Sequence, residues 1–178
     1  SDLNDHGWIV GKGTFMGAST TFLARPLANP RPVNGTVELQ DLVGECQDPV
    51  KWELWQGTTL VSAGATQLGP NGEYSIAPQV TMGNYELAFI GRTHLRSAQS
   101  VALFGSPLNG VDYSLTNGDV DHDNEVGPGD FGILANAFLS VDGDPNWVAQ
   151  ADLDCDGEVG PGDFGILANN FLLSGWNP

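Results

Sequence analysis

The C-terminal third of the chain contains one sequence unit twice. Residues 118–140 align with residues 151–173 at an offset of 33, and 17 of the 23 aligned positions are identical. Repetition this strict indicates two copies of one structural unit, which pack most easily about a pseudo-twofold axis. The repeat therefore limits the folds open to this region more than any other feature of the sequence.

Each copy begins with acidic residues at positions 1, 3, 5, 7 and 12 of a 12-residue loop. They are Asp119, Asp121, Asp123, Glu125 and Asp130 in the first copy, and Asp152, Asp154, Asp156, Glu158 and Asp163 in the second. Ca²⁺ takes six to eight oxygen ligands, and a loop of this length wraps alternate side chains around the ion while position 7 offers its backbone carbonyl. The spacing predicts one Ca²⁺ in each loop, and so two in all.

The residues that follow each loop predict a short helix. Pro128 and Pro161 suit the first helical position, where the missing N–H has no cost. Apolar residues then recur at helical spacing, and we expect this stripe to be buried; it comprises Phe131, Leu134, Ala135 and Phe138, and then Phe164, Leu167, Ala168 and Phe171. Within the loops, Asn124 and Gly157 suit the sharp turn at position 6. Val126 and Val159 at position 8 are expected to pair the two loops with each other.

The duplicated loop and helix resemble a type I dockerin, whose loops also end in Asp. The resemblance implies a secreted bacterial module, at the cell surface or outside the cell, that binds cohesin domains. The family usually has a hydroxyl pair at loop positions 10 and 11, whereas this chain has Pro128-Gly129 and Pro161-Gly162. This departure favours a structural or self-associating role. Trp176 resembles the aromatic residue with which many dockerins hold the C-terminus, and we expect it against residues 113–115.

Charge is distributed unevenly along the chain. The net charge is -16, and the 82 residues after Arg96 contain 13 Asp or Glu and no Lys or Arg. Such a surface is a poor partner for nucleic acid or an anionic membrane, and a bound cation would offset its repulsion. Since no run approaches the roughly 18 apolar residues of a membrane span, we expect no membrane insertion.

Residues 33–117 predict an antiparallel β-sandwich, because short alternating runs are separated by turn residues. The expected strands are Val33–Leu39, Val50–Gln56, Leu60–Gln67, Glu73–Ile76, Asn84–Ile90, Ala98–Leu103 and Val111–Leu115. The segments Gly69–Ile76 and Met82–Phe89 resemble the carboxypeptidase-regulatory-like and Cna B-type sandwiches of bacterial surface proteins. That resemblance implies a stalk or spacer. The basic segment Arg92–Arg96 is expected to be a solvated loop.

Residues 1–32 form a separate β leader in this interpretation. It has two β-like runs, Gly7–Thr14 and Thr20–Arg25, and its first run resembles one unit of the short repeats of bacterial extracellular proteins. A lone hairpin is marginal in water. We therefore expect an orphaned repeat segment that leans on its own sandwich, or a strand donor that joins the sheet of a neighbour.

The two cysteines, Cys46 and Cys155, have no metal-binding spacing. A disulfide between them, two unpaired thiols, and pairing between neighbouring molecules all remain open. A disulfide closing a loop of this size would contribute on the order of 4 kcal/mol.

Together these patterns predict a mainly β chain with a small α part: a β leader (1–32), an antiparallel β-sandwich (33–117) and a two-helix dockerin-like calcium-binding domain (118–178). No nucleophile motif, phosphate-binding loop or zinc spacing is present, so we expect no enzyme. The first hypothesis is a secreted, non-enzymatic calcium-binding protein that self-assembles into a homopolymer or filament. The alternative is a docking module that anchors a larger secreted protein to a cohesin-like partner.

Overall fold

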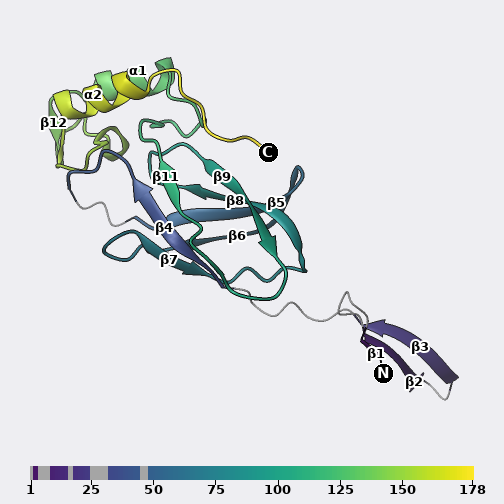
Figure 1. Ribbon diagram of the computed structural model, residues 1–178. Coiled ribbons are helices and arrows are strands. Elements are labelled where there is room, and N and C mark those ends of the chain that lie inside the picture. The colour runs from purple at the N-terminus through teal and green to yellow at the C-terminus, as the bar shows by residue number, and fades with distance from the viewer. Residues whose placement is uncertain (1, 4–8, 16–17, 25–31, 45–47) are drawn as a thin grey trace.

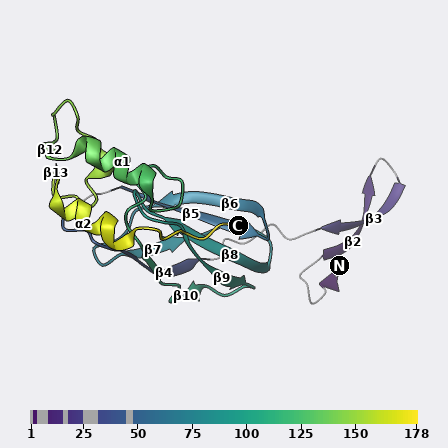
Figure 2. The same cartoon turned by 90° about the horizontal axis from the view of Figure 1, so that it is seen from above.

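The computed structural model describes residues 2–3, 9–15, 18–24, 32–44 and 48–178. Figure 1 shows a β-sandwich with two short helices at one end and a small separate sheet beyond the other end. Figure 2, turned by 90°, shows the same order. The chain is mainly β with a small α part, which confirms the predicted fold class.

The sandwich consists of two sheets. The first has the order β6-β5-β8-β9 and is antiparallel throughout; its strands are β5 (Val50–Gln56), β6 (Thr59–Thr66), β8 (Gly83–Ile90) and β9 (Ser97–Leu103). In the second, β4 (Val33–Leu39) pairs antiparallel with β7 (Glu73–Ile76). On its other side β4 pairs with β10 (Leu108–Asn109) and β11 (Tyr113–Leu115) in parallel, which the sequence did not predict.

The core between the sheets follows from the alternation along the strands. Val50 and Leu54 of β5 are buried while Lys51 between them is exposed, as period-2 patterning requires. Phe89 lies between Tyr74 and Tyr113, with ring centroids 4.6 and 4.8 Å apart. Both tyrosine hydroxyls donate to backbone carbonyls, so these rings bury no unsatisfied polar atom.

The two helices form a second core with the acidic loops. They are α1 (Pro128–Ala137) and α2 (Pro161–Asn170), joined by the short strand β12 (Ser140–Val141), the 3₁₀ turn η1 (Ala149–Ala151) and the strand β13 (Glu158–Val159). Both prolines occupy a first-turn position, as expected. The buried residues of this core are Leu95, Val120, Val126, Leu134, Ala137, Ala151, Leu153, Val159 and Leu167. Leu95 belongs to the predicted sandwich, so the two cores meet through it.

The position-8 valines are buried, but they do not pair the loops with each other. The Val126 N–H donates to the Leu173 carbonyl after α2, and Val159 pairs with Ser140 after α1. Each loop is therefore fastened to the segment that follows the other helix. This crossed pairing links the two copies at two places, and the prediction of direct loop pairing is wrong.

The predicted apolar stripe of the helices is also only partly buried. Asp130, Leu134 and Ala137 are the buried residues of α1, whereas Phe131 is 45% exposed. Asp130 turns inward to bond the loop, and residues four and seven positions later share its face. The helix therefore faces the core with Asp130 and Leu134, and Phe131 lies outside the buried face on which the apolar spacing had placed it.

The leader forms a three-stranded antiparallel sheet in the order β1-β2-β3. Its strands are β1 (Asp2–Leu3), β2 (Ile9–Phe15) and β3 (Ala18–Ala24). The predicted runs reached Gly7, Trp8 and Arg25, which lie outside the described residues. Both views show this sheet apart from the sandwich, at the end opposite the helices.

Candidate metal centres

The first acidic loop brings three carboxylates together. One oxygen from each of Asp119, Asp121 and Asp123 lies within 4.8 Å of the others. Backbone N–H groups of the loop hold these side chains in place. The amide of Asn124 donates to Asp119 Oδ2 (3.2 Å), that of Asp123 to Asp121 Oδ1 (3.2 Å), and that of Glu125 to Asp123 Oδ1 (2.9 Å). The loop is therefore wrapped around a common centre by its own backbone.

The second loop repeats this arrangement. Oxygens of Asp152, Asp154 and Asp156 lie within 4.8 Å of one another. The amides of Gly157, Asp156 and Glu158 donate to the three carboxylates at 3.2, 3.2 and 2.9 Å, in the same order as in the first loop. Equal geometry in two loops whose turn residues differ shows that the shared aspartates determine it.

The position-1 aspartates test whether a cation fits. Asp119 and Asp152 are buried, and Oδ1 of each has no hydrogen-bond partner among the residues that the structure describes. A buried anionic oxygen without a partner is costly. Burial, followed by the negative charge of Asp130, raises the pKa of Asp119 to about 6. Burial is also the first cause of the raised pKa values of Asp121, Asp152 and Asp154. A hard cation bound by these oxygens would relieve the cost, so the donor set fits Ca²⁺.

The position-12 aspartates have a different environment. Asp130 Oδ1 accepts from the amides of Val120 (2.6 Å) and Asp121 (3.0 Å), and its Oδ2 accepts from the Gly127 amide (2.7 Å). Asp163 makes the three equivalent bonds in the second copy. Both lie outside the three-carboxylate clusters. They fasten the start of each loop to the start of each helix, and their role as ligands stays a prediction.

The remaining predicted ligands, Glu125 and Glu158, have exposed side chains. Their expected contribution is a backbone carbonyl, which does not require the carboxylate to face the loop.

The structure explains why a glycine stands directly before each position-12 aspartate. A Cβ on Gly129 would lie 2.2 Å from Asp121 Oδ2, and one on Gly162 would lie 2.7 Å from Asp154 Oδ2. The position-3 carboxylate thus leaves no room for a hydroxyl side chain at position 11.

Asn124 does more than provide the turn that was expected of it. Its φ of 69° and the φ of 95° at Gly157 confirm the positive-φ turn at position 6. Its side chain also accepts from the Arg96 amide (2.8 Å) and donates to the Trp176 carbonyl (3.1 Å). The first loop is thereby bonded to the sandwich and to the C-terminal segment.

The segment Arg92–Arg96 is a buried junction, and the prediction of a solvated loop is wrong. Thr93 and His94 are buried. The Arg92 guanidinium donates to the carbonyls of Ala149 (2.8 Å) and Asp152, and it lies 3.7 Å from the Asp48 carboxylate. The backbone carbonyls at the start of the second loop need donors, and this segment provides them.

Asn117 completes the junction. Its side chain donates to the Leu153 carbonyl (2.8 Å) and accepts from the Thr93 hydroxyl (2.7 Å). Sequence reasoning missed Arg92, Thr93 and Asn117 because they lie outside the repeat. A buried asparagine directly before the first loop was the one available signal.

The repeat diverges where it contacts the sandwich. At position 4, His122 Nε2 lies 2.7 Å from the Arg92 carbonyl, whereas Cys155 in the other loop is disulfide-bonded. This excludes the unpaired thiol for Cys155; Cys46, the only other cysteine of the sequence, lies outside the described residues. Asn170 donates to the Asn117 carbonyl (2.9 Å), while its counterpart Ala137 is buried. Identical residues form the loops and helices, and divergent ones anchor them.

Trp176 folds back on the sandwich at a place other than the one expected. Its amide donates to the Arg96 carbonyl (2.7 Å), and its ring meets Trp55 of β5 edge-on, with centroids 6.1 Å apart. A shallow pocket of about 260 Å³ is lined by both Trp176 and Ser114, which belongs to the predicted contact segment. Trp55 offers a half-buried aromatic ring, whereas the ring of Tyr113 in the 113–115 strand is buried in the sandwich core against Phe89.

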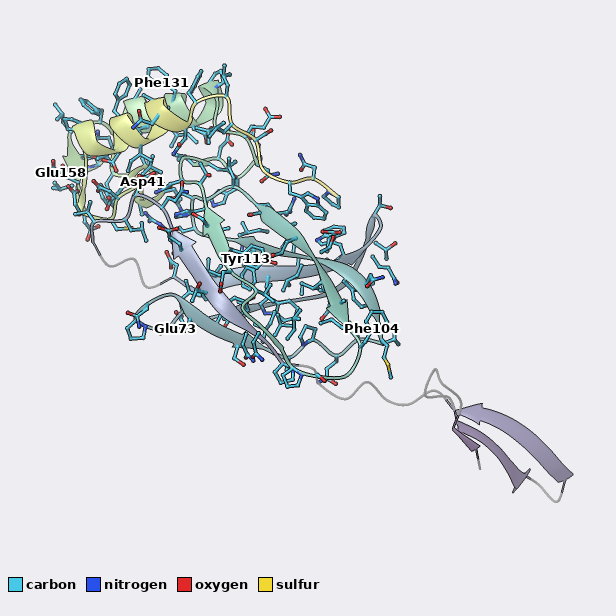
Figure 3. All side chains as sticks on the ribbon, viewed as in Figure 1. Asp41, Glu73, Phe104, Tyr113, Phe131 and Glu158 are labelled. Atoms are coloured by element: carbon cyan, nitrogen blue, oxygen red, sulfur yellow. The ribbon has the colours of Figure 1, made fainter. Side chains whose placement is uncertain are left out.

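Exposed large apolar residues occur in equivalent pairs along the two helices and directly after them. Phe131 and Phe164 are 45 and 46% exposed and meet edge-on, with centroids 6.2 Å apart. The other pairs are Phe138 and Phe171 (38 and 39%) and Leu139 and Leu172 (77 and 80%). Figure 3 shows Phe131 on the side of the helices that faces away from the sandwich. We call these six residues the aromatic face.

Comparison with known proteins places the C-terminal part in a family context. The sequence model of the dockerin type I domain matches residues 117–172. A chain of a crystal structure described as an N-terminal interface mutant of the type II cohesin-X-dockerin complex from Acetivibrio cellulolyticus has 18% identity and a TM-score of 0.62. The match covers 81% of this chain and 97% of that one. A chain of the structure described as the C-terminal interface mutant of the same complex has 17% identity and a TM-score of 0.60, with the same coverage of both chains. No curated protein matches the chain.

These comparisons support the dockerin part of the predicted family and the order of sandwich and helices. At such low identity the solved structures show similarity of fold alone. In the described part of the chain, no helix is long and apolar enough to span a membrane.

Proposed function

We propose that this chain is a secreted bacterial docking unit that binds a cohesin-like protein domain through the aromatic face. The observation that carries the proposal is this face itself. Large apolar side chains gathered on one exposed surface usually mark a protein interface. Phenylalanine at the centre of a patch also fits the preference of interfaces for aromatic residues.

Calcium has a structural role in this proposal. Two Ca²⁺ ions would be held by Asp119, Asp121, Asp123 and the Glu125 carbonyl, and by Asp152, Asp154, Asp156 and the Glu158 carbonyl, with Asp130 and Asp163 closing the loops. Without cations, each loop holds mutually repelling carboxylates close to the start of a helix. Binding would therefore stabilise the helices that carry the aromatic face.

The rest of the chain would serve as a rigid support. We propose a leader (1–32), a sandwich of the regulatory-like kind (33–117) and the calcium-binding domain (118–178), with no catalytic role for any of them. The hydrogen bond of Arg92 to the Ala149 carbonyl and the buried hydrogen bond of Asn117 to the Leu153 carbonyl support a fixed orientation between sandwich and helices. Such a support would present the face to a partner without the entropic cost of ordering a linker.

The test is calorimetric titration of the full chain against a panel of purified cohesin-like domains, in calcium and in chelator. We expect at least one domain to bind in calcium and none in chelator. Phe131→Ala/Phe164→Ala should weaken that binding at least about tenfold, as for aromatic interface residues in general. Phe104→Ala is the matched control, because Phe104 is also exposed and lies in the sandwich away from the helices (Figure 3).

If every domain of the panel fails, or if the Phe104 variant loses as much affinity as the double variant, the docking proposal is wrong. The second candidate function, a self-assembling structural protein, is favoured by a different feature, the uncharged edge strands β6 of the sandwich and β3 of the leader.

A further inference from the structure

Strand β6 forms an unprotected sheet edge. It lies at the end of the order β6-β5-β8-β9, and among the described residues it pairs only with β5. Its residues, Thr59–Thr66, include no charge and no proline, and most of them are exposed. Natural proteins usually block such an edge with lysine, proline, a bulge or a covering segment. The pairing with β5 shifts at Leu54/Trp55, but Ser62–Thr66 stay in continuous register and remain open.

The opposite edge of the same sheet is different. The Gln99 side chain of β9 donates to the Asp112 carbonyl (3.1 Å), so the segment leading into β11 is bonded to a side chain of this edge strand. In the second sheet, the edge strand β7 carries Glu73 at its start. Among β6, β7 and β9, strand β6 alone is both uncharged and without a hydrogen bond to a neighbouring segment outside its sheet in the described part of the chain.

The leader offers an edge of matching character. Strand β3 (Ala18–Ala24) lies at the end of the order β1-β2-β3 and also lacks charge and proline. With seven residues it is close in length to the eight of β6. A sheet of three strands, one of them only two residues long, is marginal in water without further cover.

The net charge of the chain limits which surfaces of two copies can come into contact. A net charge of -16 opposes close approach of two chains in most orientations. Contact between β3 and β6 brings two uncharged strands together. Both views also show the leader beyond the end of the sandwich that is opposite the helices, where it is accessible to another molecule.

We propose that β6 of one copy accepts β3 of a second copy as an added strand. Backbone hydrogen bonds along the two edges would provide the affinity, as in other cases of strand addition. Each copy carries one donor and one acceptor, so the contact is head-to-tail and extends into a chain of molecules unless it closes into a ring. The aromatic face stays free in such an assembly, and the proposal does not depend on the docking function.

Two variants separate donor from acceptor. Ala63→Lys/Ala65→Glu places charges on the open edge while each new side chain lies opposite an opposite charge in β5, Glu53 or Lys51. This pairing preserves the fold and the net charge. Thr21→Pro/Phe22→Pro changes adjacent positions of β3, whose N–H groups point to opposite sides. One proline therefore removes an N–H group from the free edge of β3, and the other disrupts the pairing of β3 within the leader sheet. Both effects prevent β3 from acting as the added strand.

Size-exclusion chromatography with light scattering, in calcium, measures the outcome. The unaltered chain should at least double its mass as concentration rises, and each variant alone should stay monomeric. An equimolar mixture of the two variants should form a 1:1 dimer, because one retains β3 and the other retains β6. Phe131→Ala/Phe164→Ala should assemble like the unaltered chain.

The proposal is overturned if the unaltered chain is monomeric at every concentration that it tolerates. It is also overturned if the β3 variant still self-associates, which would indicate pairing between two β6 edges. Loss of assembly in the aromatic-face variant would assign self-association to the helices instead, and failure of the mixture to form a dimer would exclude the donor–acceptor contact.

Discussion

Asp119 and Asp130 are both buried in the same loop, yet their carboxylate oxygens differ in hydrogen bonding. Asp119 Oδ1 has no hydrogen-bond partner within the described part of the chain, and burial raises the pKa of this carboxyl to about 6. Asp130 accepts three backbone hydrogen bonds. The 12-residue spacing alone treats the two as equal ligands, because spacing cannot show which oxygens the backbone already uses.

The first prediction concerns Asp119→Asn. At pH 7 the variant should melt lower than the unaltered chain in millimolar calcium, because lost binding removes linkage stabilisation of about 2.7 kcal/mol at a calcium concentration of 100 times Kd. In chelator it should melt at the same temperature or higher. Without calcium, the unaltered chain must keep the buried Asp119 carboxyl ionised at pH 7 although its pKa is raised, which lowers stability. The asparagine of the variant is uncharged and does not have this cost.

Calorimetry of both proteins in calcium and in chelator measures this reversal of sign. Asp152→Asn is the matched variant in the second loop, where Oδ1 is also without a hydrogen-bond partner. A lower melting temperature in both buffers would show that Asp119 acts through packing rather than through a bound cation.

His94 gives a second prediction at the residue scale. Burial is the first cause that lowers its pKa to about 4 from the usual 6.5, and the nearby Arg92 acts in the same direction. The folded state therefore favours the neutral ring. Its contribution to stability is fully present above pH 6.5 and is lost as pH falls from 6.5 towards 4, on the order of 3 kcal/mol in all.

Urea titrations between pH 7 and pH 4.5, in saturating calcium, compare the unaltered chain with His94→Gln. Glutamine does not titrate and can still bond the Gln40 carbonyl, which lies 3.3 Å from His94 Nε2. The free energy of unfolding should fall more steeply with acid for the unaltered chain. Parallel curves would show that His94 titrates normally.

At the scale of elements, periodicity predicted strands better than helix orientation. The bounds of β4, β5 and β7 agree with the alternating runs, because one face of each strand is buried and the other is wet. For α1 the apolar spacing predicted Phe131 as core, but the hydrogen bonds of Asp130 set the inward face. Parallel pairing of β4 with β11 could not be predicted, since it depends on where a distant segment returns.

The third prediction tests Asp130 as the fastener between loop and helix. Asp130→Ala removes three hydrogen bonds to a carboxylate, and it should lower stability by about 2–4 kcal/mol in calcium and in chelator alike. Circular dichroism during thermal unfolding in both buffers measures this, and Asp163→Ala should behave equally because Asp163 makes the same bonds. An effect confined to calcium would instead assign Asp130 to the ion.

At the scale of the whole molecule, the repeat predicted the two loops and helices but not their attachment to the sandwich. The anchoring residues, among them Arg92, Asn117 and His122, come from both sides of the junction and have no shared pattern. The carboxylate clusters could be found from sequence because neighbouring positions of one loop build them. The junction could not, because its partners are far apart along the chain.

The last prediction follows from this junction. Asn117 bonds Thr93 on the sandwich side and Leu153 in the second loop, so the two cores should unfold together in calcium as one calorimetric transition. Asn117→Ala leaves the buried Leu153 carbonyl without this donor, at a cost of about 1–3 kcal/mol. The transition should then begin at a lower temperature and separate into two.

Asn34→Ala is the matched control, because Asn34 bonds Asn109 within the sandwich surface, far from the loops. A variant of Asn117 that still unfolds in one transition would show that other contacts, such as those of Arg92, couple the cores without this side chain.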